Sequence, residues 1–235
     1  MYKRQSFDYA NRWITDLRSA TSFLSQDWRV PALILTFIQH ILVGNIGQLA
    51  LQYLSKQYSL TFSQATLVFV IRAAVNMILL CFILPWIADF VMQHFHLSSR
   101  RKDLYLSRVS AMFMVIGFAL FAISPNVPTV AISLAITSLG AGTMYLIRSF
   151  LTSLVEPNQV ARVYSIISMV DTVGSMFGGP LLAALFRQGL EIGGAGVGLP
   201  FLFLSLVSLV LVVLLFVIRI RRGEDDEETS NEGEA

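Results

Sequence analysis

The fold is decided by the stretch at residues 199–218, which reads LPFLFLSLVSLVLVVLLFVI. The stretch is apolar almost throughout and contains no charged side chain. The hydrocarbon core of a bilayer is about 30 Å thick, and a helix of roughly 20 apolar residues crosses it. The stretch therefore predicts a membrane-spanning helix.

Five further stretches upstream have the same character. Turn residues separate them, as in Ser124-Pro125-Asn126. Helices are expected because lipid offers no hydrogen bonds to an unpaired backbone. The sequence thus predicts an all-α polytopic membrane bundle of about six transmembrane helices. The predicted spans are Val30–Tyr53, Ala65–Ile87, Leu104–Ile123, Val130–Leu154, Val163–Phe186 and Leu199–Ile218.

The composition supports this class of protein. Of the 235 residues, 55% are hydrophobic and 14% are charged, and the mean hydropathy is +0.66. A soluble domain carries about 25% charged residues. The net charge of +2 is too small to indicate a nucleic-acid partner. The single cysteine, Cys81, allows no disulfide within the chain, and no cluster of Cys and His indicates a metal. We therefore expect neither metal nor cofactor.

The lysines and arginines predict the orientation of the chain in its membrane. Apart from Arg72 and Arg148 inside the spans, only Lys56 and Arg187 fall on one side of the predicted spans, and the others gather on the opposite side. Because short cytosolic loops are enriched in Lys and Arg, the richer side is predicted to be cytosolic, with both termini on it. The sequence does not indicate whether the membrane is plasma or vacuolar. The basic side carries Lys3, Arg4, Arg12, Arg18, Arg29, Arg100, Arg101, Lys102, Arg108, Arg162, Arg219, Arg221 and Arg222.

The chain divides into three regions. Residues 1–29 place Trp13, Leu17 and Trp28 near one helical stripe, which predicts an amphipathic helix on the cytosolic surface of the membrane. A docking site for another protein is the alternative. Residues 30–218 form the six-helix bundle, and residues 219–235 are a basic and then acidic tail, expected to be disordered in the cytosol.

Four of the six spans carry polar side chains that share a helical face. The first span has Asn45, Gln48 and Gln52, and the second has Arg72 and Asn76 one turn apart. The fourth span carries Arg148 and the fifth carries Asp171, each on a polar stripe. The third and sixth spans hold little beyond scattered serines, so we expect these two to face lipid.

The charged residues Arg72 and Asp171 are the most informative. A charge near the bilayer centre costs on the order of 3 kcal/mol, so it faces a partner or a wet cavity. One alternative is a buried Arg72–Asp171 pair that only fixes helix packing. The other is contact with a substrate or proton coupling. Arg148 lies nearer the cytosolic end, where its side chain can reach the interface.

Small residues mark the fifth span at Gly174, Gly178, Gly179 and Pro180. Small side chains let helix backbones approach closely, which favours tight packing at this patch. A bending point used in gating is the alternative.

These features together resemble a known family. The segment Pro85-Trp86-Ile87-Ala88-Asp89, followed by Arg100-Arg101-Lys102, resembles the second copy of the cytosolic gating-loop motif of the major facilitator superfamily. It departs from that motif in having Pro where Gly is usual and a long gap before the basic run. The segment from Gly174 to Pro180 is similar to the repeat counterpart of the family's antiporter motif. The chain from Val30 to Ile218 thus resembles helices seven to twelve, the C-terminal half, of a fungal-type transporter.

The resemblance implies a proton-coupled or facilitative carrier of a small organic molecule, with efflux as the expected direction. By position, the first and fourth spans would line a cavity, and the second and fifth would face the other half. Asp171 is the expected site of proton exchange, because a dry site favours the neutral form of a carboxyl group. The candidate positions for substrate or coupling are Asn45, Gln48, Gln52, Arg72, Asn76, Arg148 and Asp171.

The family has about twelve helices, and this chain supplies six. We therefore expect the lipid bilayer, a small-molecule substrate and a second six-helix half as partners, the last being a second copy, a separate chain or an upstream part. The alternative is a truncated, non-transporting relic, or a membrane-embedded partner of a full-length carrier. An enzyme is not expected, because His40 is the single histidine inside a span and no serine motif accompanies it, while His94 and His96 lie in a loop.

Overall fold

The computed structural model describes residues 28–87, 90, 99–155 and 159–218. Within these residues every regular element is helical, and six helices are long and apolar enough to cross a membrane. The predicted all-α membrane bundle is thus confirmed. The N-terminal region up to Asp27, Asp89 of the loop motif and the tail from Arg219 lie outside the described residues, and so do His94 and His96.

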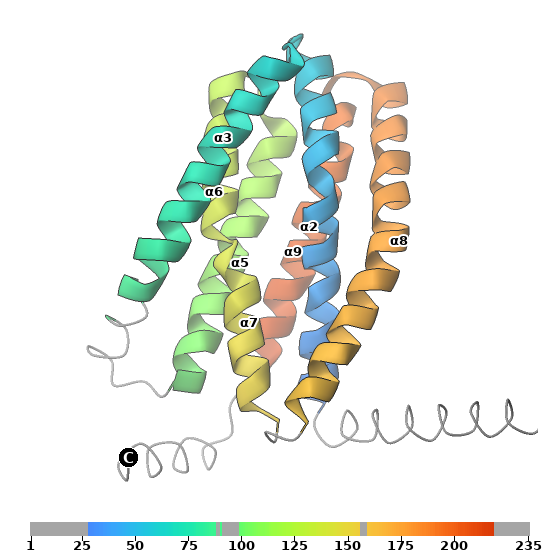
Figure 1. The fold of residues 1–235 in the computed structure, drawn as a ribbon. Coiled ribbons are helices and arrows are strands. Elements are labelled where there is room, and N and C mark those ends of the chain that lie inside the picture. The colour runs from blue at the N-terminus through green and yellow to red at the C-terminus, as the bar shows by residue number, and fades with distance from the viewer. Residues whose placement is uncertain (1–27, 88–89, 91–98, 156–158, 219–235) are drawn as a thin grey trace, which may run out of the picture.

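The chain runs up and down through the bundle (Figure 1). The first span is α2 and the second is α3, which continues through a π-helical stretch and ends at Ile87. The fourth span consists of two helices, α6 and α7. A short 3₁₀ turn, η3, joins α8 to α9. The bounds are α2 (Arg29–Tyr58), α3 (Phe62–Ile78), η2 (Leu79–Ile83), α5 (Ser99–Ile123), α6 (Val127–Leu139), α7 (Gly142–Ser153), α8 (Val160–Ile192), η3 (Gly194–Gly198) and α9 (Leu199–Val217).

Local sequence sets several helix ends. The Thr61 side chain accepts the Gln64 amide N–H, and Gln64 in turn accepts the Thr61 amide N–H, which starts α3 with a capping box. Asn126 and Thr129 make the same reciprocal contact at the start of α6. At the end of α8, Gly193 has φ 72°, a left-handed angle that suits glycine.

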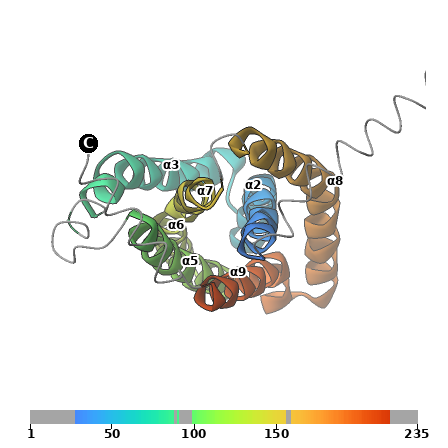
Figure 2. The same cartoon turned by 90° about the horizontal axis from the view of Figure 1, so that it is seen from below.

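Figure 2 shows the arrangement of the helices from below. In this view α3 and α8 lie at opposite sides, with α7 and α2 between them. Below α7 and α2 in this view, α5 packs along α9 and also against α6. We call the end at which α2 begins the lower end and the opposite end the upper end, as in Figure 1.

The helices differ in how much of their surface the chain itself covers. In the most apolar 18-residue stretch of each span, the share of buried residues is 11% for the second span and 17% for α8. It is 50% for α5 and 44% for α9. The spans that carry Arg72 and Asp171 are therefore the least covered. The third and sixth spans, which we expected to face lipid, are α5 and α9. These two helices pack together and so cover part of each other's surface.

The apolar interior is split into two clusters. The upper cluster is built around the large buried side chains of Tyr53, Phe121 and Phe201, whose ring centroids lie 4.1 to 5.5 Å apart. The lower cluster includes Phe37 and Phe150. A polar layer lies between the two clusters.

Hydrogen bonds from side chains also join the helices. Gln39 Nε2 of α2 lies 3.0 Å from Ser208 Oγ of α9 in the buried interior. At the lower end, Arg108 of α5 donates to the carbonyl oxygens of Leu215 and Ile218, at 3.0 and 2.8 Å. A cationic side chain at the C-terminus of a helix satisfies carbonyls that lack intrahelical partners. Arg108 thus caps the C-terminus of α9 and adds a positive charge at the lower end of the bundle.

Candidate functional site

A cavity of about 240 Å³ lies between the two apolar clusters. Side chains from α2, α3, α5, α6, α7 and α9 line it, whereas α8 contributes none. His40 and Tyr145 at its edge are exposed, so the cavity reaches the surface of the chain. The lining residues are Thr36, Gln39, His40, Val43, Gly44, Gly47, Arg72, Asn76, Met114, Thr137, Gly140, Ala141, Thr143, Met144, Tyr145, Ile147 and Leu211.

The interruption of the fourth span forms one wall of the cavity. The amides of Gly140 and Ala141 donate to carbonyls three residues back, so the α-helical pattern stops there and restarts at Gly142. A Cβ at Gly140 would overlap the Met114 side chain and approach the Ser110 carbonyl within 2.8 Å, so α5 and the break are in close contact. Broken helices at membrane depth are tolerated where the irregular backbone lines a cavity or is covered by protein.

Arg72 and Asn76 of α3 form the wall next to this break, where Ser138 Oγ donates to the Arg72 carbonyl oxygen at 3.4 Å. The Arg72 Cζ atom lies 6.0 Å from the centroid of the Phe69 ring. No carboxylate in the described part of the chain makes an ion pair with Arg72, so the Arg72–Asp171 pair considered from the sequence is not formed. The Asn76 Oδ1 atom is buried and has no hydrogen-bond partner among the described residues.

A second polar group lies beside the cavity, where α2, α7 and α8 meet. His40 is close enough to Asp171 and Arg148 to interact electrostatically with both. Asp171 Oδ1 and Arg148 Nε are buried and lack hydrogen-bond partners among the described residues. We call His40, Arg148 and Asp171 the His40 group. Sequence reasoning passed over His40 as a binding residue, although an ionisable residue inside a span is itself a signal of function.

The polar residues predicted on the first span lie elsewhere. Asn45 donates from Nδ2 to the Ile41 carbonyl at 2.9 Å, and Gln48 is exposed. Gln52 borders a separate pocket at the upper end, together with Lys56 and Arg187. Of the seven candidate positions, Arg72 and Asn76 line the central cavity, and Arg148 and Asp171 belong to the adjacent His40 group.

The small residues of α8 do not all face the same neighbour. A Cβ at Gly174 would lie 2.5 Å from Ile41 Cδ1, and one at Gly178 would lie 3.2 Å from Leu42 Cδ2, so both glycines face α2. A Cβ at Gly179 would meet no atom within 4 Å, and Pro180 is exposed. Gly179 and Pro180 thus lie on the side of α8 that the chain leaves uncovered.

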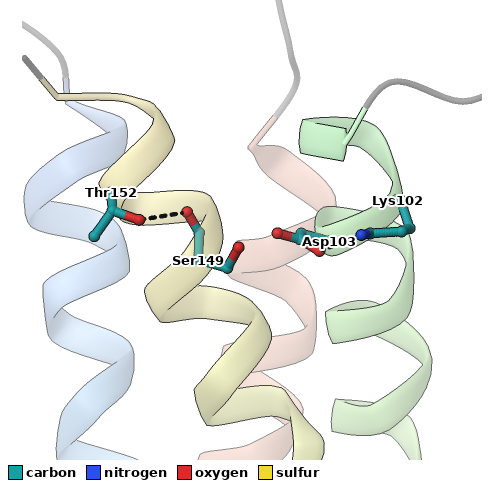
Figure 3. Close-up of polar contacts among 4 residues, drawn as sticks. All are labelled: Lys102, Asp103, Ser149 and Thr152. Atoms are coloured by element: carbon teal, nitrogen blue, oxygen red, sulfur yellow. Dashed lines mark hydrogen bonds and ion pairs between the residues drawn. The ribbon is translucent and has the colours of Figure 1, made fainter. Parts of the chain in front are cut away.

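Part of the loop motif lies at the lower end of α5. Asp89 is outside the described residues, and so is the Arg100 side chain. Arg101 follows in the first turn of α5, and the Lys102 Nζ atom lies 3.6 Å from Asp103 Oδ1. Figure 3 shows the Asp103 side chain extending from α5 toward Ser149 of α7. Asp103 is buried, and sequence reasoning missed it because it follows a basic run that we assigned to the loop.

The chain matches known proteins in sequence and in fold. The sequence profile described as Major Facilitator Superfamily matches residues 32–235. The MFS-type transporter avaK of Aspergillus versicolor is 28% identical over 209 residues, which is 89% of this chain and 46% of avaK. The MFS efflux pump atnC of Emericella nidulans is 29% identical over 177 residues, which is 74% of this chain and 34% of atnC.

A solved structure supports the fold alone. The transporter PepTSo of the POT family superposes with a TM-score of 0.60 at 15% identity, over 80% of this chain and 37% of PepTSo. The chain therefore spans less than half the length of the relatives described here.

Proposed function

The chain belongs to the major facilitator superfamily, and we propose that it forms one half of a carrier that exports a small organic molecule. It is an integral multi-pass membrane protein. The observation that carries the proposal is the cavity between the two apolar clusters with Arg72 in its lining, because an apolar bundle with a packing role alone has no need of a half-buried cation there. The relatives are transporters and efflux pumps, which favours transport over a non-transporting relic or an enzyme.

A second six-helix half is part of this proposal. The spans of α3 and α8 are the ones that the rest of the chain covers least. In Figure 2 they lie on either side of α2 and α7. Arg72 of α3 and Asp171 of α8 would be unfavourable next to lipid. A second half packed against this surface would shield both charges and close the cavity. It is a second copy, a separate chain or another part of the same polypeptide.

The orientation follows from the ends of the helices. Arg29, Arg101, Lys102 and Arg162 lie at the lower ends of α2, α5 and α8, whereas Lys56 and Arg187 lie at the upper end. We propose that the lower end is cytosolic, because cytosolic loops carry the excess of Lys and Arg. In this orientation the loop motif with Arg101 and Lys102 faces the cytosol.

The two polar regions have separate proposed roles. Arg72 and Asn76 contact the substrate, because both line the cavity. The His40 group exchanges the coupling proton, because it brings an imidazole and a carboxylate together beside the cavity. Carriers of this architecture alternate access by rocking two halves around a site near the middle of the membrane.

Transport by the reconstituted chain tests this function. Proteoliposomes containing the chain would be loaded with a panel of labelled organic compounds, and efflux would be compared with empty liposomes. We expect efflux of at least one compound to exceed the leak and to fall at least tenfold in Arg72→Gln. Crosslinking between cysteines placed on exposed positions of α3 and α8 would report the second half. Flux equal to the leak for the whole panel, in chain that crosslinks as a pair, would refute transport.

A further inference from the structure

The cavity has an unbalanced charge. Of the described residues that line it, Arg72 alone carries a permanent charge, and none is Asp or Glu. His40 at the edge adds positive charge when it is protonated. A cavity of this kind attracts anions, because a cation withdrawn from water gains most from an opposite charge in the same dry space.

Most other polar side chains of the lining already have partners. The hydroxyl groups of Thr36, Thr137 and Thr143 each donate to a backbone carbonyl of their own segment. Gln39 donates from Nε2 to Ser208 Oγ. These donors are engaged within the bundle, which leaves the α3 wall to receive a ligand.

Of the other polar groups in the lining, His40 and Tyr145 are exposed, whereas Arg72 and Asn76 are half-buried. Arg72 and Asn76 lie one turn apart on α3, and the Arg72 Cζ atom lies 6.0 Å from the centroid of the Phe69 ring. Asn76 has a buried Oδ1 without a partner among the described residues. A guanidinium presents a planar fork of N–H donors that matches the two oxygens of a carboxylate, whereas the Oδ1 of Asn76 is an acceptor and suits an O–H or N–H group of the ligand.

Another part of the cavity lining is apolar. Met114 of α5, Met144 of α7 and Leu211 of α9 contribute to it. Methionine side chains adapt to ligands of different shape. A ligand that fits both walls has an acidic group at one end and an apolar body at the other.

We propose that the exported molecule is an amphipathic organic acid whose carboxylate binds Arg72 and whose apolar body contacts Met114, Met144 and Leu211. This inference rests on the proposed function of the same cavity. Asn76 accepts a hydrogen bond at Oδ1 from an O–H or N–H group of the same molecule. The cavity volume of about 240 Å³ limits the part of the molecule that this half holds.

Two probes of the same shape test the inference. Binding of 2-naphthoate and of 2-naphthamide to the purified chain in lipid nanodiscs would be measured by calorimetry. We expect the carboxylate to bind at least tenfold more tightly than the amide, and added salt to weaken only the carboxylate. Arg72→Gln should abolish the preference, whereas Arg72→Lys should retain part of it because the charge stays and the planar fork is lost.

A matched control comes from the upper end. Arg187 is exposed, lies outside the cavity and pairs with Glu191 at 3.7 Å, so Arg187→Gln should keep the full preference. Equal affinity for the two probes, binding of neither, or a preference that survives in Arg72→Gln would overturn the inference. The salt dependence of the unmodified chain decides the question even if the variants fold poorly.

The same measurements separate this inference from the proposed function. Proteoliposomes that show no efflux, made from chain that prefers 2-naphthoate, would refute transport and keep the anion site. Efflux of a neutral compound that 2-naphthoate does not inhibit, from chain that binds both probes equally, would refute the anion site and keep transport.

Discussion

The Arg148 Cζ atom of α7 lies 5.6 Å from the centroid of the Phe37 ring of α2. Phe37 is fully buried, whereas Arg148 is partly buried with an Nε atom that lacks a hydrogen-bond partner among the described residues. The contact holds the cation of the His40 group against α2 and links two helices that border the cavity. A guanidinium within about 6 Å of a ring centroid is stabilised by the ring quadrupole.

Exchanging both members of this pair should reveal their coupling. In a double-mutant cycle of Phe37→Leu and Arg148→Met, we expect a coupling free energy of about 0.5–2 kcal/mol, because the ring and the cation interact directly. The measurement is reversible unfolding in detergent micelles. Phe150→Leu is the control. Phe150 is as buried as Phe37 in the same cluster, and it makes no cation–π contact among the described residues. Strictly additive effects of the two substitutions would contradict the prediction.

The Gln39–Ser208 hydrogen bond should contribute to the stability of the bundle. Ser208→Ala leaves a buried amide N–H of Gln39 without its oxygen partner, and we expect a loss of about 1 kcal/mol in unfolding free energy. Ser205→Ala should cost less, because Ser205 donates to the Val115 carbonyl, which is also part of a helix. Thermal unfolding in detergent compares the two variants. Equal losses would show that the interhelical bond to Gln39 contributes nothing specific.

Substitution of glycine by alanine should change the stability of the chain differently at Gly117 and at Gly179. A Cβ at Gly117 would overlap Thr137 and approach its backbone nitrogen within 2.7 Å, so Gly117→Ala should destabilise the α5–α6 contact by about 1–3 kcal/mol. Gly179→Ala meets open space within this chain and should be neutral or slightly stabilising, because alanine favours helix.

The Gly179 variant also tests the proposed second half. In a complex with a second half, destabilisation by Gly179→Ala would place that residue at the interface between halves. The measurement is the melting temperature of the chain alone and of the complex. A harmless Gly117→Ala would show that α5 and α6 can separate without cost.

Asp171 should be required for coupling rather than for substrate exchange. Asp171→Asn removes a group that can release a proton, so we expect flux driven by a pH gradient to fall at least tenfold while exchange of labelled for unlabelled substrate continues. Vesicle assays with and without the gradient measure both. Glu191→Gln is the control, because Glu191 is exposed at the upper end of α8. Undiminished gradient-driven flux in Asp171→Asn would remove Asp171 from this role.

The spans were predictable because the bilayer imposes a rule on each segment separately. Residues 199–218 had to be helical whatever surrounded them, since lipid cannot satisfy a free backbone. The helices nevertheless extend beyond the apolar stretches, as in α8, which runs from Val160 to Ile192 rather than from Val163 to Phe186. Hydropathy locates the part of a helix within hydrocarbon, and the helix continues wherever its backbone bonds remain favourable.

The candidate site was only partly predictable. Charge inside a span pointed to Arg72 and Asp171, because the energetic cost of an intramembrane charge can be read from sequence. The face formed by Asn45, Gln48 and Gln52 was also recognisable, but the cavity lies beside a different face of α2, with His40, Val43 and Gly47. Periodicity groups residues on one face of a helix without saying what that face meets.

The amino-acid sequence by itself determined that the chain crosses a membrane six times as helices and that it has two spans with costly charges. Tertiary structure alone decided the rotation of α2, the interruption of the fourth span at Gly140, and the separation of Arg72 from Asp171. The physical reason is that solvation by lipid acts on each helix alone. Helix rotation and pairing are instead set by contacts between helices, such as Ile41 of α2 against Gly174 of α8 and Met114 of α5 against Gly140.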